Sequence, residues 1–177
     1  MTNVDPKAKL IEGLQTQVQK LQKQIIEIPL RIKVQKTDAH FYRSQNKEDS
    51  DHLGLGKYLL VVDVTASKET LYIPTSIASG RKSTGFIFHI EGENKSSGTA
   101  TITSEGDGIV TVTAGSIAYT KIPPQKTARF KIRVEVLGSI RKSYKVVVSR
   151  INYKVNPNDL RYKRFLTEVD TDFLKFK

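Results

Sequence analysis

The sequence predicts a mainly β protein, an Ig-like β-sandwich with an N-terminal coiled-coil helix and a C-terminal docking tail. Three observations predict it: an apolar heptad repeat near the N-terminus, a series of short strand segments separated by turn residues, and a C-terminal segment that is both apolar and basic. A chain of 177 residues has room for one domain of ordinary size with appendages. We therefore divide it into residues 1–29 (helix), 30–56 (strand and polar linker), 57–155 (sandwich) and 156–177 (tail).

The first segment has the signals of a helix that begins at Pro6 and ends before Pro29. Asp5 is a suitable N-cap, a proline fits the first helical position, and a second proline stops the helix. Between them apolar residues recur in alternating steps of three and four, which is a heptad seam. The seam has Ile11, Val18 and Ile25 at its a positions and Leu14, Leu21 and Ile28 at its d positions.

Self-association is the simplest use of this seam. The flanking e and g positions are all glutamine, and neutral side chains there carry no charge pattern for a foreign partner. β-Branched residues at a and leucine at d favour a homodimer, whereas Ile28 at a d position favours a trimer. The alternative is a single amphipathic helix packed on its own domain.

The residues after Pro29 change from a helical to a strand pattern. Leu30, Ile32 and Val34 alternate with polar residues, which predicts a strand. Residues 36–56 are mostly polar, and we expect a linker or a long loop there.

Residues 57–155 predict eight strands. Glycine- and proline-containing turns such as Pro123-Pro124 separate them. This number of short strands fits a sandwich of immunoglobulin-like size, or a small barrel. The chain has no Cys and no Trp, so the Cys…Trp…Cys core of antibody domains is absent and only the architecture is predicted. The predicted strands are 57–64, 70–74, 84–91, 99–104, 108–113, 116–121, 127–137 and 143–155.

The tail combines apolar and basic residues, and Asn156-Pro157 is suited to capping a short helix. A segment this apolar is seldom left free in water, so it either covers its own domain or docks on a neighbour. The partner-docking candidates are Arg161, Tyr162, Lys163, Arg164, Phe165, Leu166, Phe173 and Phe176.

The positive charge is concentrated in the last third of the chain. Residues 1–120 hold 14 Lys and Arg against 13 Asp and Glu, whereas residues 121–177 hold 15 against 5. Arg129, Lys131 and Arg133 alternate with apolar residues, which places a basic stripe on one face of a strand. Such a stripe attracts polyanions, and the alternative is an ordinary solvated strand face. The aromatic residues of these strands alternate inward and offer no stacking platform, so the sequence does not favour nucleic acid as a partner.

No catalytic, metal or cofactor site is predicted. The absence of Cys excludes a disulfide scaffold, a cysteine nucleophile and a cysteine-ligated zinc site. The histidines, His40, His52 and His89, match no zinc spacing, and Gly54-Leu55-Gly56-Lys57 lacks the first glycine and the Ser/Thr of a phosphate loop. We expect a non-enzymatic protein. No membrane-spanning segment and no signal peptide are recognisable in the sequence.

The layout resembles accessory structural proteins of tailed-phage virions, namely head fibres and capsid decoration proteins that join a coiled coil to an Ig-like domain. The seam from Ile11 to Ile28, the strand series of residues 57–155 and the apolar-basic tail carry the resemblance. The segment from Ile122 to Phe130 also resembles the proline turn before a late strand of bacterial Ig-like domains.

The resemblance implies assembly and surface display rather than catalysis. The implied partners are further copies of the chain and other virion proteins such as the capsid, and the implied location is the virion, after synthesis in the host cytoplasm and release by lysis. Two alternatives remain: an adhesin module that binds glycan or a host surface, and a nucleic-acid-binding protein that uses the basic C-terminal third.

Overall fold

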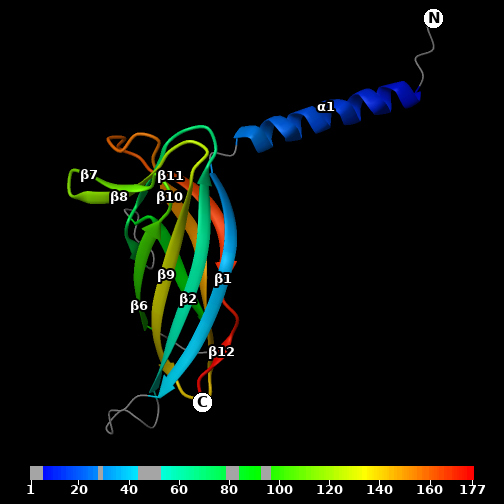
Figure 1. Cartoon of the computed structure of the whole chain (residues 1–177). Coiled ribbons are helices and arrows are strands. Elements are labelled where there is room, and N and C mark those ends of the chain that lie inside the picture. The colour runs from blue at the N-terminus through cyan, green and yellow to red at the C-terminus, as the bar shows by residue number, and fades with distance from the viewer. Residues whose placement is uncertain (1–5, 28–29, 44–52, 79–83, 93–96) are drawn as a thin grey trace, which may run out of the picture.

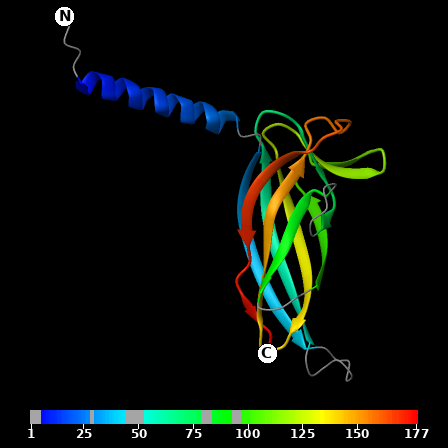
Figure 2. The ribbon, with the colours of Figure 1, turned by 180° about the vertical axis from the view of Figure 1, so that it is seen from behind.

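The computed structural model of the chain describes residues 6–27, 30–43, 53–78, 84–92 and 97–177. It has one helix and a mainly β body of antiparallel sheets (Figure 1). The body is elongated, and α1 lies apart from its sheets in both views (Figures 1 and 2). The elements are α1 (Pro6–Glu27), β1 (Leu30–Arg43), β2 (Leu53–Ala66), β3 (Leu71–Pro74), β4 (Ile77–Ala78), β5 (Phe86–Gly92), β6 (Ser97–Glu105), β7 (Val110–Ala114), β8 (Ile117–Ile122), β9 (Thr127–Ser139), β10 (Ser143–Tyr153), β11 (Lys163–Asp170) and β12 (Leu174–Lys175).

The strands form two large sheets and a small one. The first has the order β1-β2-β9-β6, and the second has the order β11-β10-β5-β4, with β12 also paired to β10. All pairings in them are antiparallel except β4 with β5. The small sheet, β3-β8-β7, carries a hairpin that projects beside the body (Figure 1).

The core lies between the two large sheets. Buried and more exposed residues alternate along β2 and β9, so each strand turns one face inward. Phe130 of β9 meets Phe86 of β5 across the interior, with ring centroids 4.9 Å apart. Tyr58 of β2 donates its hydroxyl proton to the carbonyl oxygen of Tyr144 of β10 at 2.9 Å. Burial of a polar group requires such a partner, and this bond joins the two sheets.

The eight strands predicted between residues 57 and 155 are all present, as β2, β3 and β5 to β10, with bounds shifted by a few residues. The mainly β class and the strand after Pro29 are therefore confirmed. The helix is confirmed from Pro6 to Glu27, whereas Ile28 and Pro29 lie outside the described residues. The Ig-like identity of the body and the coiled coil stay predictions.

The predicted linker at residues 36–56 is wrong where the structure describes it. β1 continues to Arg43 and β2 begins at Leu53, and the two strands pair along their whole lengths. The register shifts between Val34 and Lys36, which indicates a β-bulge. A bulge reverses the inward and outward positions that follow it, so the simple alternation stops while the strand continues.

The predicted helix at Asn156 and the separate tail are also wrong. Turns follow β10, and then β11 returns antiparallel to it in the second large sheet. Phe176 is 0% exposed and belongs to the core. Much of residues 156–177 is thus part of the β body. The sequence left two alternatives for this segment, covering its own domain or docking on a neighbour, and Phe176 covers its own domain.

Candidate functional site

The apolar face of α1 is exposed in the single chain. Leu10, Ile11, Leu14 and Val18 are 66%, 55%, 53% and 51% exposed. A contiguous row of large apolar side chains in water is a mark of an interaction site, whereas isolated ones are ordinary. Leu21 and Ile25 lie in α1, but their side chains are outside the described part of the structure, as is Ile28.

This face is an uncovered surface along one side of the helix. It is formed by Ile11, Leu14, Gln15, Val18 and Gln19. These positions are spaced by three, one, three and one residues, so they share one side of an α-helix. On the side away from the seam, the Thr16 hydroxyl donates to the carbonyl oxygen of Glu12 at 2.9 Å. The predicted oligomerisation residues that the structure describes therefore lie together and have no cover.

The predicted docking residues of the tail do not form one surface. Phe176 is buried, and Phe165 is partly buried against the core. Leu166 and Phe173 are 78% and 59% exposed. Arg161, Lys163 and Arg164 are also exposed.

Tyr162 belongs to a cluster that fixes the turn after β10. Its hydroxyl shares a hydrogen bond with the hydroxyl of Tyr119 at 3.1 Å. Burial, followed by the hydrogen bond with Tyr119 and electrostatic repulsion from it on ionisation, raises the pKa of the Tyr162 phenol above its ordinary range, so Tyr162 stays neutral. The buried Lys154 ammonium lies 4.7 Å from the centre of the Tyr162 ring and 5.6 Å from that of Tyr119, and it donates to the carbonyl oxygen of Pro157 at 3.2 Å. This cluster was not predicted from the sequence, because Lys154 and Tyr119 are distant along the chain.

The predicted basic stripe is largely paired with acids of neighbouring strands. Arg129 donates from Nε to Asp63 Oδ1 at 2.8 Å and from Nη2 to Asp63 Oδ2 at 3.0 Å. Lys131 lies 2.8 Å from Glu105 Oε1. Among the described residues Arg133 has no ion pair. The stripe is therefore a mixed-charge sheet face, and its attraction for a polyanion is much weaker than the sequence alone suggests.

The Asp63–Arg129 pair predicts a pH-dependent contribution to stability. The hydrogen bond from Arg129 is the main cause that lowers the pKa of Asp63, which means that the folded state binds this proton less readily than the unfolded state. The contribution is full above the unfolded pKa of about 3.9 and is lost as the pH falls through the lower folded value.

Asp63→Asn should therefore lower the melting temperature by a few degrees at pH 7. Its difference from the wild type should shrink as the pH falls below about 3.9 and then through the lower folded-state pKa of Asp63. Thermal melts of both proteins between pH 2 and 7 measure this, and a difference that stays constant with pH would contradict the pairing.

A second charged cluster joins β5, β10 and β11 on the outer face of their sheet. Lys145 Nζ lies 2.9 Å from Asp170 and 3.2 Å from Glu91, and Glu91 lies 3.1 Å from His89 Nε2. The pKa of Glu91 is lowered, chiefly by its hydrogen bond with His89 and next by that with Lys145. The pKa of Lys145 is raised, chiefly by its hydrogen bond to Asp170 and next by that to Glu91. Glu91 and Lys145 are thus held in their charged forms, and the contacts join three strands, which is a structural use. His40 lies 3.3 Å from Asp38, and His52 is outside the described residues.

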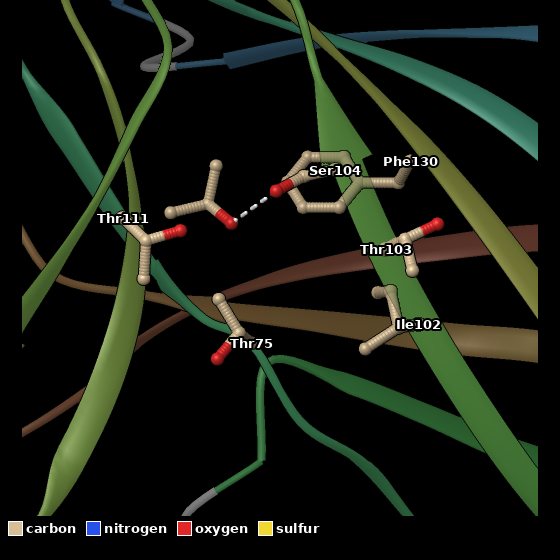
Figure 3. Close-up of a pocket in the computed structure, with 7 residues that line it drawn as sticks. Thr75, Ile102, Thr103, Ser104, Thr111 and Phe130 are labelled. Carbon is tan, nitrogen blue, oxygen red and sulfur yellow. Dashed lines mark hydrogen bonds between the residues drawn. The ribbon is translucent and has the colours of Figure 1, made fainter.

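A polar cavity lies between β6 and the β7–β8 hairpin (Figure 3). Its volume is about 330 Å³. Ile102 and Phe130 line one side, and Thr75 and Thr111 lie across from them (Figure 3). Ser104 of β6 and Thr120 of β8 join their hydroxyls at 2.8 Å. This site was not predicted, because its residues come from five separate segments and none of them carries a charge that would indicate a site in the sequence.

Comparison with known proteins places no further constraint on the site, since no family model, no curated protein and no solved structure matches this chain. Within the described ranges no group of three or more acidic, histidine or cysteine side chains is placed to hold a metal ion. The described helix is too polar to cross a bilayer.

Proposed function

We propose that the protein is a non-enzymatic, self-associating structural component of a virion, of the head-fibre or capsid-decoration type. The observation that carries the proposal is the uncovered apolar face of α1. A helix with an exposed apolar face needs a partner to cover it, and the β body of the same chain does not pack against this face (Figures 1 and 2).

A second copy of the chain is the partner that suits this face best. The 22 residues of α1 span about 33 Å, and most of the stability of such a helix comes from packing of its apolar face. A parallel coiled coil would bury Ile11, Leu14 and Val18 against their equivalents. The glutamine residues beside the seam impose no charge match, which allows identical helices to pair. We propose a homodimer, with a trimer as the alternative that Ile28 would favour.

The β body suits display on a particle. Two sheets pack face to face, and consecutive strands such as β5 and β6, or β9 and β10, lie in different sheets. This arrangement supports an Ig-like sandwich as the finer description of the fold. Contacts with a capsid would use the exposed face of β11, where Arg164 would guide the encounter and Leu166 would add apolar area.

Immuno-electron microscopy tests the proposal. Antibodies raised against the purified protein should decorate phage particles purified from the natural source, and particles that lack the gene are the matched control. Label that stays in the soluble fraction and never sediments with particles would contradict a virion role, whether or not the chain self-associates.

A further inference from the structure

The cavity beside β6 has the walls of a ligand site. β6 is the last strand of its sheet, and the cavity is lined by residues of β6 together with Thr111 of β7 and Thr120 of β8. The tight turn of the hairpin uses Gly115, whose φ of 61° favours glycine. The cavity volume of about 330 Å³ lies near the lower end of the range of about 300–1,000 Å³ that is typical of small-molecule sites. A ligand that fills it has the size of one or two small rings.

The polar character of the cavity comes from the half-buried Ser104 and the exposed Thr111, and behind Ser104 lies the hydroxyl of Thr120, a residue that is 0% exposed. In the Ser104–Thr120 pair one hydroxyl donates to the other, so the accepting hydroxyl keeps a proton to donate and both keep lone pairs. Thr111 is exposed and directs its hydroxyl toward this pair in Figure 3. Thr75 donates its proton to the carbonyl oxygen of Ala118 at 3.2 Å. Thr103 points its hydroxyl away from the cavity (Figure 3).

The remaining surface of the cavity is apolar and uncharged. Ile102 is partly buried, and the ring of Phe130, 0% exposed, closes the cavity from the core side. None of the described lining residues is charged, so an ion would lose hydration here without gaining a counter-charge. A suitable ligand is therefore neutral, has an apolar face, and carries several hydroxyl groups that both donate and accept.

We propose that this cavity binds a neutral saccharide unit. The C–H face of a pyranose ring would contact Ile102 in front of the buried Phe130 ring, and its hydroxyls would exchange hydrogen bonds with Ser104 and Thr111. With so few polar contacts the affinity for one unit is weak, in the millimolar range of about 10⁻³ M. The proposal depends neither on self-association nor on a virion.

Titration of the full-length, ¹⁵N-labelled protein tests the proposal. The probes are the methyl glycosides of glucose, galactose, mannose and N-acetylglucosamine. At least one should produce saturable shifts of backbone amide signals that centre on Ser104, Thr111 and Thr120. Removing a hydrogen-bonding hydroxyl from such a site weakens binding several-fold, so Thr111→Val should raise the dissociation constant by about fivefold or more.

Two further variants make the result specific to the cavity. The double variant Ser104→Ala/Thr120→Val removes both hydroxyls together, which avoids leaving one of them buried without a partner, and it should abolish the shifts while the spectrum stays folded. Thr113→Val, an exposed position on the same strand that does not line the cavity, should bind as the wild type does. Absence of saturable shifts with every neutral glycoside, shifts that Thr111→Val and the double variant leave intact, or stronger binding of a charged sugar such as galacturonate would each overturn the proposal.

Discussion

Replacing Phe176 with alanine should lower the free energy of unfolding by about 3–5 kcal/mol, the usual cost of truncating a fully buried phenylalanine. The ring is 0% exposed, and its centroid lies 5.1 Å from that of Phe41 and 4.8 Å from that of Tyr144. The native state of such a domain is stable by only about 5–15 kcal/mol, so the loss is a large share of the total. Urea denaturation followed by circular dichroism measures it.

The surroundings of Phe176 leave little room for compensation. Its amide donates to the carbonyl oxygen of Lys142 at 2.8 Å, and its carbonyl oxygen accepts from the amide of Arg141 at 2.7 Å, so the backbone is fixed on both sides. A Cβ on Gly56 would lie 2.6 Å from the Phe176 ring. The ring therefore fills the space that Gly56 of β2 leaves because it has no side chain, and truncating the ring would open a cavity there.

Phe173→Ala is the matched control, since it makes the same substitution three residues earlier. Phe173 is 59% exposed and lies over the Lys145 ammonium at 5.2 Å, so its truncation should cost less than about 1 kcal/mol. Equal losses for the two variants, or a wild-type unfolding curve for Phe176→Ala, would show that the C-terminus is not part of the core.

Local patterns in the sequence were sufficient to predict eight strands between residues 57 and 155 and the start of β1, but not β4, β11 or β12. β9 illustrates this, because Ala128, Phe130, Ile132 and Val134 alternate with charged residues and every one of them is buried. The same reasoning placed the start of α1 at Pro6. It failed at β1, where the register shift after Val34 interrupts the alternation, since the bulge depends on pairing with β2.

The tail was misassigned because its role depends on tertiary contacts. Phe173 and Phe176 are the same residue type in the same apolar segment, yet Phe173 is exposed and Phe176 is in the core. Which side of the chain turns inward is decided by pairing with β10, from which they are separated by the turns after Tyr153. Composition indicated that the segment needs cover, and only the structure shows how much of that cover is internal.

Charge was the least predictable property of the candidate surfaces. The net charge of residues 121–177 is correct as a count, but Asp63 lies 66 positions before Arg129 and Glu105 lies 26 before Lys131. Strand pairing of β9 with β2 and β6 brings these acids to the basic stripe. The polar cavity was missed for a related reason, since its hydroxyls meet only after β6 and β8 have packed.

Leu14→Lys should convert a self-associated protein into a monomer. We expect light scattering of the wild type at micromolar concentrations to give twice the chain mass of 19.9 kDa, or three times if the trimer forms, and the variant to give 19.9 kDa. Leu14 is at a d position of the seam, where a coiled coil would bury the new ammonium among apolar side chains. The dissociation constant should rise by at least about 100-fold, since each tenfold corresponds to about 1.4 kcal/mol. Because lysine is a good helix former, the effect would arise in the seam rather than from helix propensity.

Thr16→Lys adds the same charge at the f position, on the side of α1 that faces away from the seam. Its side chain is exposed and bonds only back to Glu12 within the described residues, so the variant should keep the mass of the wild type. Dilution gives an independent readout, because most of the stability of such a helix comes from packing of its apolar face and its circular dichroism signal should decrease as the wild type dissociates. A monomeric wild type whose helix signal does not change with concentration or with Leu14→Lys would mean that α1 covers its apolar face on its own chain, and the self-association proposal would then fail.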